Sequence, residues 1–266
     1  MPAPESPRRV HDAAAAAGEV RDTSVGKALA VLDTLSGSRK SLGVSEIAAR
    51  TGMAKSTVHR LLSAMIEHGY VAKEGERYLL AERVFELGSR VQVGAAKDLR
   101  ELASPYLAEL FALTRQTIHL AILSGADILY IDKVSGLGAP RMDTRIGGRR
   151  PAYATGLGKA LLAFAPSLHL RTVLDGSFKR FTAYTIPDAQ RMKLSLLRVR
   201  ETGIATDHEE SFLGVACLAA PVWAADHSRA VAAVSLSCPV LGRTPARYKS
   251  VLVDTAQQLS SALHRK

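Results

Sequence analysis

The stretch from Gly43 to Tyr70 contains two short helical patterns separated by a break at Thr51-Gly52, and no other part of the chain constrains the fold as strongly. In the first pattern, Ser45 stands where a side chain can cap a helix start. The second pattern carries a longer apolar stripe at helical spacing, formed by Val58, Leu61, Leu62, Met65 and Ile66. Such a stripe has to face a core. A third helical pattern, Ser24 to Ser36, precedes the pair, so we expect a small three-helix unit.

The face opposite this stripe is polar. At about 100° per residue, the side chains of Ser56, His59, Arg60, Ser63 and Glu67 point away from the core. They are short or hydroxylated, and basic near the helix start, which suits a helix lying in a DNA major groove. A plain helical hairpin with a solvated outer face is the alternative. The DNA contacts predicted on the two helices are Ser45, Lys55, Ser56, Thr57, His59 and Arg60, with Lys55 on phosphate.

Two short β-rich segments follow the helix pair. Tyr70 to Ala72 and Tyr78 to Leu80 flank a charged turn that contains Gly75, which is typical of a β-hairpin. A helix pair followed directly by such a hairpin predicts a winged helix-turn-helix. Lys73 and Arg77 on the hairpin are then placed to reach phosphate or a minor groove.

The positive charge of the chain supports this prediction only weakly. The net charge is +10 and the isoelectric point about 9.8, which favours a polyanionic partner. Up to Val93, however, 13 Lys and Arg stand against 11 Asp and Glu, whereas Gly94 to Lys266 carries 22 against 14. The excess is therefore larger outside the proposed DNA-binding part, and the prediction depends on motif and geometry.

Other features of composition narrow the class of protein. Two cysteines, Cys217 and Cys238, do not make a secreted disulfide framework. No run of about 18 apolar residues predicts a transmembrane helix. The run from Ala13 to Ala17 is too short and too weakly apolar for an export signal, so residues 1–22 are expected to form a disordered tail of a cytoplasmic protein.

The rest of the chain mixes helices with antiparallel hairpins. Helices are expected over residues 98–113, 187–201 and 244–264, and Thr155 is a candidate cap for a helix within 151–164. Strands are expected over residues 117–123, 128–134, 141–146, 215–223 and 229–238. This mixture predicts an α+β sensor-like domain. The expected division is a winged helix-turn-helix over 23–81, a linker helix over 82–97 and the sensor domain over 98–266; an ordinary core helix is the alternative to the linker.

With these elements placed, the sequence resembles the IclR family of bacterial transcriptional regulators from Ser24 to the C-terminus. The N-terminal matches are Ser24 to Leu29, Ser45 to Ala48 and Thr51 to Leu62, and the C-terminal matches are Pro151 to Ala163, Gly203 to Glu210 and Gly214 to Val222. The resemblance implies a winged helix-turn-helix joined to a GAF-like effector domain, in a dimer or a dimer of dimers. It also implies a small organic effector, often a carboxylate or aromatic acid.

The resemblance further implies where the effector binds. The predicted effector residues are Met142, Thr155, Gly156, Leu157, Asp207, Cys217, Ser235 and Ser237. A helix N-terminus with Gly156 and Gly158 is expected to offer unpaired N–H groups to an anion. Ser235 and Ser237 share one face of their strand, since they are two residues apart.

The position of Cys217 depends on strand register. If the last two strands form a hairpin centred near Asp226, Cys217 lies across from Ser235 and shares its face. A one-residue slip sets Cys217 near Leu236 or Cys238 instead and turns the serines outward. We favour the first register; a small buried hydrophobe is the simplest alternative role for Cys217.

Several other residue groups are discounted as sites. Asp207 to Glu210 are consecutive residues expected in one loop, which seldom converge on one metal ion. His119 and His169 lack a nucleophile elbow, and Gly136 to Ala139 lacks the third glycine of a phosphate loop. Arg149 and Arg150 are expected on a solvated face, although either is placed to steer an anion inward.

The sequence therefore predicts a DNA-binding regulator that is not an enzyme and needs no cofactor or metal. Two copies are expected to place the helix from Met53 to His68 in successive major grooves, about 34 Å apart on a pseudo-palindromic operator. Repression is favoured over activation. The alternative is a small-molecule sensor or hydrolase-like protein whose winged unit mediates protein contacts.

Overall fold

The computed structural model describes most of the chain and divides it into two compact units. One unit runs from Met1 to Val91 and the other from Gln92 to Lys266. The described residues are 23–38, 40–90, 94–136, 142–224, 226, 228–240 and 245–265, so the predicted N-terminal tail lies outside them. Within this part of the chain, no helix is long and apolar enough to cross a membrane.

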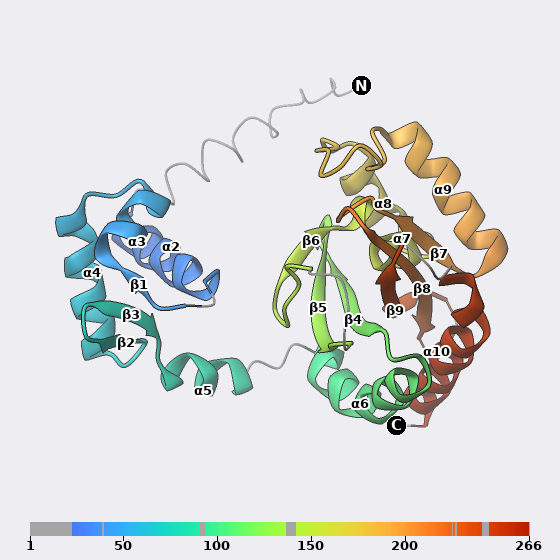
Figure 1. Ribbon diagram of the computed structural model, residues 1–266, viewed down its shortest axis with the longest axis horizontal. Coiled ribbons are helices and arrows are strands. Elements are labelled where there is room, and N and C mark those ends of the chain that lie inside the picture. Colours follow the sequence, from blue (N-terminus) through green and yellow to red (C-terminus); the bar gives the residue numbers. More distant parts are fainter. Residues whose placement is uncertain are drawn as a thin grey trace, which may run out of the picture. The chain divides into compact units, whose positions relative to one another are not determined.

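In the described part of the first unit, three helices pack together with a small sheet, and a further helix, α5 (Glu82–Arg90), follows them (Figure 1). The helices are α2 (Ser24–Ser36), α3 (Val44–Thr51) and α4 (Lys55–Glu67). Gly52 ends α3 in the left-handed conformation, at φ 72°, which provides the break that the sequence predicts. The apolar stripe packs inward as expected, although Ile66 remains 38% exposed. The buried side chains form one core: Val31, Leu35, Leu42, Ile47, Ala48, Val58, Leu62, Met65, Val71 and Tyr78.

The predicted hairpin follows these helices as β2 (Val71–Glu74) and β3 (Arg77–Leu80), and α5 (Glu82–Arg90) comes next. A third strand that the sequence did not reveal, β1 (Leu42–Gly43), pairs with β3, so the sheet order is β1-β3-β2. The prediction that Ser45 caps α3 is wrong. The helix begins after Gly43, and the Glu46 carboxylate accepts a hydrogen bond from the Gly43 N–H at 2.8 Å.

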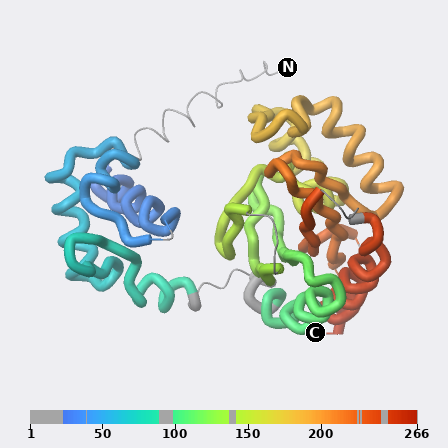
Figure 2. The backbone as a smooth tube through the Cα atoms, viewed as in Figure 1, coloured from blue at the N-terminus to red at the C-terminus, as the bar shows by residue number. Residues whose placement is uncertain are grey.

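A six-stranded antiparallel sheet forms the centre of the second unit. Its strands are β4 (Thr117–Ser124), β5 (Asp127–Val134), β6 (Arg149–Pro151), β7 (Ala205–His208), β8 (Val215–Trp223) and β9 (Ala230–Pro239). The order β6-β5-β4-β9-β8-β7 joins an early and a late hairpin through the β4–β9 pairing. Figure 2 shows the corresponding green and red segments side by side. Residues more than 100 positions apart in sequence thus share one surface.

Helices cover both faces of this sheet. On one face, α6 (Gly94–Thr114) and α10 (Lys249–His264) bury a core that includes Leu107, Leu252 and Leu236. On the other face lie α7 (Gly156–Leu162), α8 (Ser167–Leu174) and α9 (Ala189–Thr202) (Figure 1). The predicted α+β architecture is confirmed, and strand residues alternate between the two cores.

Three expectations about this unit are corrected. Residues 142–146 form no strand, and after β5 the chain returns to the sheet at β6. Arg141, the first residue of the expected strand, lies outside the described residues. Asp207 and His208 belong to strand β7, because they pair with β8, rather than to a loop. A short 3-10 helix, η2 (Pro245–Tyr248), precedes α10, so the closing helix starts at Lys249.

The register of the last hairpin differs from the prediction by two residues. Cys217 lies opposite Ser237, and Ser235 lies opposite Ala219. A bulge between Val222 and Trp223 contributes to this shift. Since a shift of two preserves the face of every side chain, Cys217 still points to the same side as both serines.

Candidate functional sites

The outer face of α4 carries most of the residues predicted to contact DNA. Lys55, Ser56, His59 and Arg60 are exposed, while Thr57 is half-buried. Ala54 precedes the helix and provides no side-chain cap. The first N–H groups of α4 therefore face outward beside Lys55, an arrangement that attracts phosphate. Ser45, also exposed, lies on α3.

The two basic residues of the hairpin are engaged by neighbouring groups of the same unit. Arg77 donates to the Ser41 carbonyl at 2.9 Å through Nε, and its Nη2 lies 2.9 Å from the Glu46 carboxylate. Lys73 lies 3.4 Å from Glu76. The Gly43 N–H, followed by the nearby Arg77, lowers the pKa of Glu46. Arg77 thus ties β3 to the segment before α3, a positioning role that the sequence did not predict.

In the second unit, four strands place a row of polar side chains under α7. Asp207 of β7 lies opposite Cys217 of β8, Cys217 lies opposite Ser237 of β9, and Ser237 lies opposite Thr117 of β4. Ser235 stands one pleat away in the same face. Neighbouring side chains in such a row are about 5 Å apart, so they form one continuous wall.

This wall forms one side of a small cavity. Thirteen residues line it: His119, Tyr130, Met142, Thr144, Thr155, Gly156, Leu157, Asp207, Ser211, Phe212, Cys217, Ser235 and Ser237. All eight residues predicted to bind an effector are among them. The cavity measures about 20 Å³, which is room for about one water molecule. An organic molecule fits only if part of the lining moves.

The start of α7 is already occupied by the chain's own groups, contrary to expectation. Thr155 caps the helix as predicted, because its hydroxyl accepts a hydrogen bond from the Gly158 N–H at 2.9 Å. Asp207 accepts from the N–H groups of Gly156 and Glu210. The prediction that Gly156 and Gly158 offer unpaired N–H groups to an anion is therefore wrong.

A buried charge cluster lies beside the cavity. Lys159 is only 2% exposed, and its Nζ lies 2.5 Å from the Glu210 carboxylate. Glu210 Oε2 is buried and has no hydrogen-bond partner among the described residues. Burial raises the pKa of Asp207 to about 7, although Lys159 works against this rise. The Asp207 carboxyl therefore takes up or releases a proton near neutral pH.

The thiol of Cys217 lies 3.1 Å from the hydroxyl of Ser237. Burial, and then the nearby Asp207 carboxyl, raises the pKa of Cys217 well above its ordinary value. The group is accordingly a neutral thiol at neutral pH rather than a nucleophilic thiolate.

Five lining residues were not predicted as effector contacts. They are His119, Tyr130, Thr144, Ser211 and Phe212. Burial lowers the pKa of His119 to about 3, so this ring is neutral, and its Nε2 lies 2.9 Å from the Thr144 hydroxyl. Alternation along β4 and β5 places His119 and Tyr130 in one layer, but only the β4–β9 pairing reveals that this layer faces the serines.

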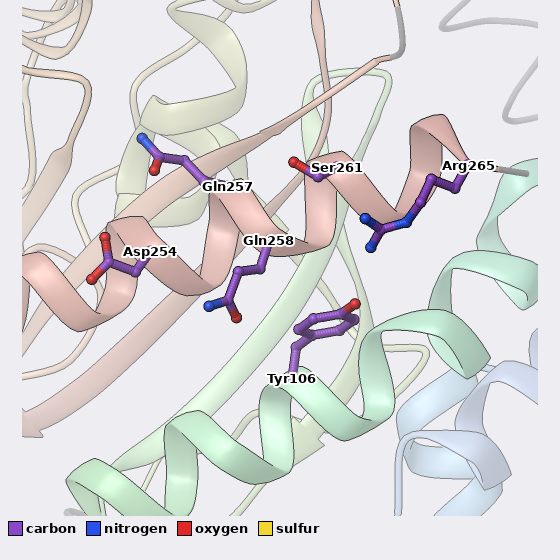
Figure 3. A pocket seen from close by; sticks show the side chains of 6 residues that line it. All are labelled: Tyr106, Asp254, Gln257, Gln258, Ser261 and Arg265. Atoms are coloured by element: carbon purple, nitrogen blue, oxygen red, sulfur yellow. The ribbon is translucent and has the colours of Figure 1, made fainter.

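A wider hollow of about 470 Å³ lies on the opposite side of the sheet. It is lined by Tyr106 of α6 and by side chains of α10, and Figure 3 shows these side chains on the two helices. The residues from α10 are Asp254, Gln257, Gln258, Ser261 and Arg265. None of the residues predicted as a site lies there. Among the described residues, no group of three His, Cys, Asp or Glu side chains is arranged to hold a metal ion.

A winged helix-turn-helix followed by an α+β sensor unit with a small cavity against its sheet is the architecture of a DNA-binding regulator. Two family models match in the corresponding order: the IclR helix-turn-helix domain over residues 24–75, and the C-terminal part of the bacterial transcriptional regulator IclR over residues 91–261. The chain belongs to the IclR family of transcriptional regulators, as the sequence predicts.

Individual relatives agree with this assignment. The chain is 37% identical over 247 residues to the HTH-type transcriptional regulator KdgR of Escherichia coli, covering 91% of this chain and 92% of that protein. It is 30% identical over 257 residues to the transcriptional repressor IclR of the same organism, covering 94% and 92%. These homologues are transcriptional regulators rather than enzymes.

A solved structure shows the same fold. An IclR homologue from Microbacterium hydrocarbonoxydans, complexed with 4-hydroxybenzoate, has a TM-score of 0.80 with this chain at 23% identity. The match covers 92% of this chain and all of that one. The two-domain prediction, with a winged helix-turn-helix and a GAF-like effector domain, is confirmed.

Proposed function

We propose that this regulator is a repressor that binds a pseudo-palindromic operator as a homodimer or a dimer of dimers. We further propose that α4 enters the major groove and that a small organic acid in the cavity controls DNA affinity. Repression is supported by the transcriptional repressor IclR among its relatives, and a small acid by the 4-hydroxybenzoate bound to the Microbacterium homologue.

The state of the basic residues supports the role of α4. Lys55 and Arg60 are exposed and have no acidic partner among the described residues, whereas Lys73 and Arg77 each pair with a glutamate. An unpaired cation gives up less favourable free energy when it binds phosphate, because no existing ion pair has to be broken. Lys55 and Arg60 are therefore proposed as principal contacts, with Ser45, Ser56, Thr57 and His59 beside them and Lys73 and Arg77 at the edge.

Fluorescence anisotropy on the promoter DNA next to the gene tests this assignment. Arg60→Ala is expected to weaken binding about tenfold and to reduce the slope of affinity against salt by about one ion. Arg171→Ala removes the same charge from an exposed position on α8 of the other unit and serves as the matched control. If both variants bind like the wild type, α4 is not the recognition helix. If the wild type binds no duplex, the winged unit serves protein contacts instead.

The observation that carries the effector site is the convergence of eight residues, predicted from distant stretches of sequence, on one cavity. The cavity is nearly filled without a ligand, so an effector has to bind a more open arrangement of its walls. Such binding changes DNA affinity only if the effector prefers one conformation of the dimer over the other.

A double substitution tests the cavity. Ser235→Ala combined with Ser237→Ala removes two hydroxyl donors from the wall, and we expect it to abolish the effect of acids on DNA binding. The probes are 4-hydroxybenzoate and the acids handled by enzymes encoded beside the gene. Ser228→Ala, in an exposed turn of the same hairpin, is the control. A normal response in the double variant places the effector site elsewhere.

A further inference from the structure

The lining of the cavity contains no lysine or arginine. The nearest buried cation is Lys159, whose charge is already balanced by Glu210 at 2.5 Å. An effector with a carboxylate brings a negative charge next to Asp207, which is itself an acid. A cation beside the site strengthens the binding of an organic acid, and the lining itself supplies none.

Arg150 is placed to be that cation. It lies on the edge strand β6 opposite Ile128 of β5, and Ile128 is buried on the α7 side of the sheet. Paired residues of neighbouring strands point to the same face, so Arg150 extends on the cavity side. Its charge also reaches Tyr130 in the lining: burial raises the pKa of Tyr130, and Arg150 opposes that rise.

The guanidinium of Arg150 stacks on the ring of Phe212. Its central carbon lies 4.1 Å from the centre of that ring and 5.6 Å from the centre of the Phe181 ring. No acidic side chain of the described residues pairs with it. A guanidinium held over a ring without an acidic partner keeps N–H donors available, and its pair of parallel donors matches the two oxygens of a carboxylate.

Of the residues that line the cavity, Phe212 is the one best placed to move aside. It belongs to the loop between β7 and β8, where Glu209 and Gly214 both adopt left-handed backbone, at φ 59° and 76°. The Glu209 carboxylate accepts a hydrogen bond from the Gly214 N–H and closes the base of this loop. Phe212 itself is half-buried, with one side on the cavity and Arg150 against its ring.

We propose that Arg150 binds the carboxylate of the effector, and that the Phe212 ring beside it blocks the entrance to the cavity until an effector binds. When an acid enters, the Phe212 ring moves aside and the guanidinium exchanges its contact with the ring for the carboxylate. The uncharged part of the acid then lies toward Asp207, Ser235 and Ser237, which favours a monocarboxylate over a diacid. This inference rests on the proposed role of the cavity as the effector site.

Alkylation of Cys217 tests the proposal without knowledge of the natural effector. Iodoacetate and iodoacetamide are nearly the same size, but only iodoacetate carries a carboxylate. Cys217 lines the cavity, so the ratio of its two labelling rates measures how strongly the site favours an anion. The full-length protein carries Cys238→Ala, because Cys238 is the other cysteine of the chain, and mass spectrometry of the labelled peptide gives each rate.

Arg150→Gln is expected to lower the iodoacetate to iodoacetamide ratio about fivefold, the size expected for a partly exposed ion pair. Arg150→Lys keeps most of the ratio, since it keeps the charge. Phe212→Leu raises both rates and leaves the ratio unchanged. Arg149→Gln is the matched control, because Arg149 bonds to Ser124 and lies on the other face of the same strand.

The outcomes separate this inference from the proposed function. If Cys217 is labelled but the ratio is the same in Arg150→Gln, the cavity admits small acids and Arg150 does not recognise them. If the ratio falls in Lys133→Gln instead, the cation is Lys133, which donates to the Thr144 carbonyl behind the cavity. If iodoacetamide labels Cys217 in the folded protein and iodoacetate does not, the thiol is reactive but the cavity admits no small acid, and the effector site itself is refuted.

Discussion

The buried pair of Lys159 and Glu210 makes a strong prediction about stability. Lys159→Met is expected to lower the free energy of unfolding by about 3 to 5 kcal/mol, because it leaves a buried carboxylate without its counter-charge. Glu210→Gln is expected to lower it less, by about 1 to 2 kcal/mol. Lys159 keeps a second carboxylate, that of Asp207, within electrostatic reach.

Urea unfolding followed by tryptophan fluorescence measures these losses in the correct unit. The chain has a single tryptophan, Trp223, on β8, and its ring centre lies 4.6 Å from that of Phe164. Changes in its emission therefore report on the sensor unit alone. Lys159→Met combined with Glu210→Met is expected to lose less than Lys159→Met alone, because no glutamate is then buried without a partner.

The loss in Lys159→Met also depends on pH in a defined direction. Without the lysine, the pKa of Asp207 rises further in the folded protein, so the folded state binds more protons than the unfolded state. Stability then falls as pH rises. The loss is expected to be larger at pH 8 than at pH 5.5. Equal losses for Lys159→Met and Glu210→Gln, with no difference between the two pH values, would refute the reasoning.

Three further predictions follow from the same unit. The pKa of Asp207 is about 7 in the folded protein against an ordinary value of 3.8, so its ionisation destabilises the fold as pH rises from about 4 to 7. Asp207→Asn is expected to flatten this part of the profile of urea stability against pH, and an unchanged profile contradicts this prediction. Gly158→Ala is expected to lower the free energy of unfolding by more than about 3 kcal/mol, because a Cβ there overlaps the Ala152 backbone. Gly88→Ala, on an exposed part of α5 with open space around it, is the control, and thermal melting is expected to show unchanged or higher stability for it. Thr155→Val removes the cap of α7 and is expected to cost about 1 kcal/mol in urea, while Thr155→Ser retains the hydroxyl and the stability; equal losses in the two variants exclude the cap.

Local rules explain what the sequence could predict. The hairpin of β4 and β5 turns at Gly125, whose φ of 66° is the kind of backbone that glycine favours, so the turn was visible in the sequence. The cap at Thr155 and the left-handed end of α3 at Gly52 follow from equally local chemistry. The shared face of Ser235 and Ser237 follows from the two-residue period of a strand.

Competing local contacts and non-local pairing explain the errors. The cap of α3 was assigned to Ser45 because hydroxyls commonly fill that role, but the Glu46 side chain reaches back to Gly43 instead. Strand β7 contains charged residues and reads as a loop until β8 pairs with it. The bulge near Trp223 has no signature in the sequence and changed the partner of Cys217.

The electrostatic arrangement around the cavity was equally hidden. The use of Asp207 as the acceptor at the start of α7 depends on two segments about 50 residues apart. The stacking of Arg150 on Phe212 brings together residues from β6 and from the loop after β7. Contacts of this kind require the order of strands in the sheet, which periodicity within single segments does not contain.

The pairing of β4 with β9 has a consequence for how the protein is made. The winged unit is complete once residues up to about Leu80 have been synthesised, whereas the cavity wall closes only when Ser235 and Ser237 have joined β4. A chain that stops between these points carries an intact α4 but lacks half of the cavity wall. On the proposed role of the cavity, premature termination between these points is expected to yield a DNA-binding fragment that no effector can release.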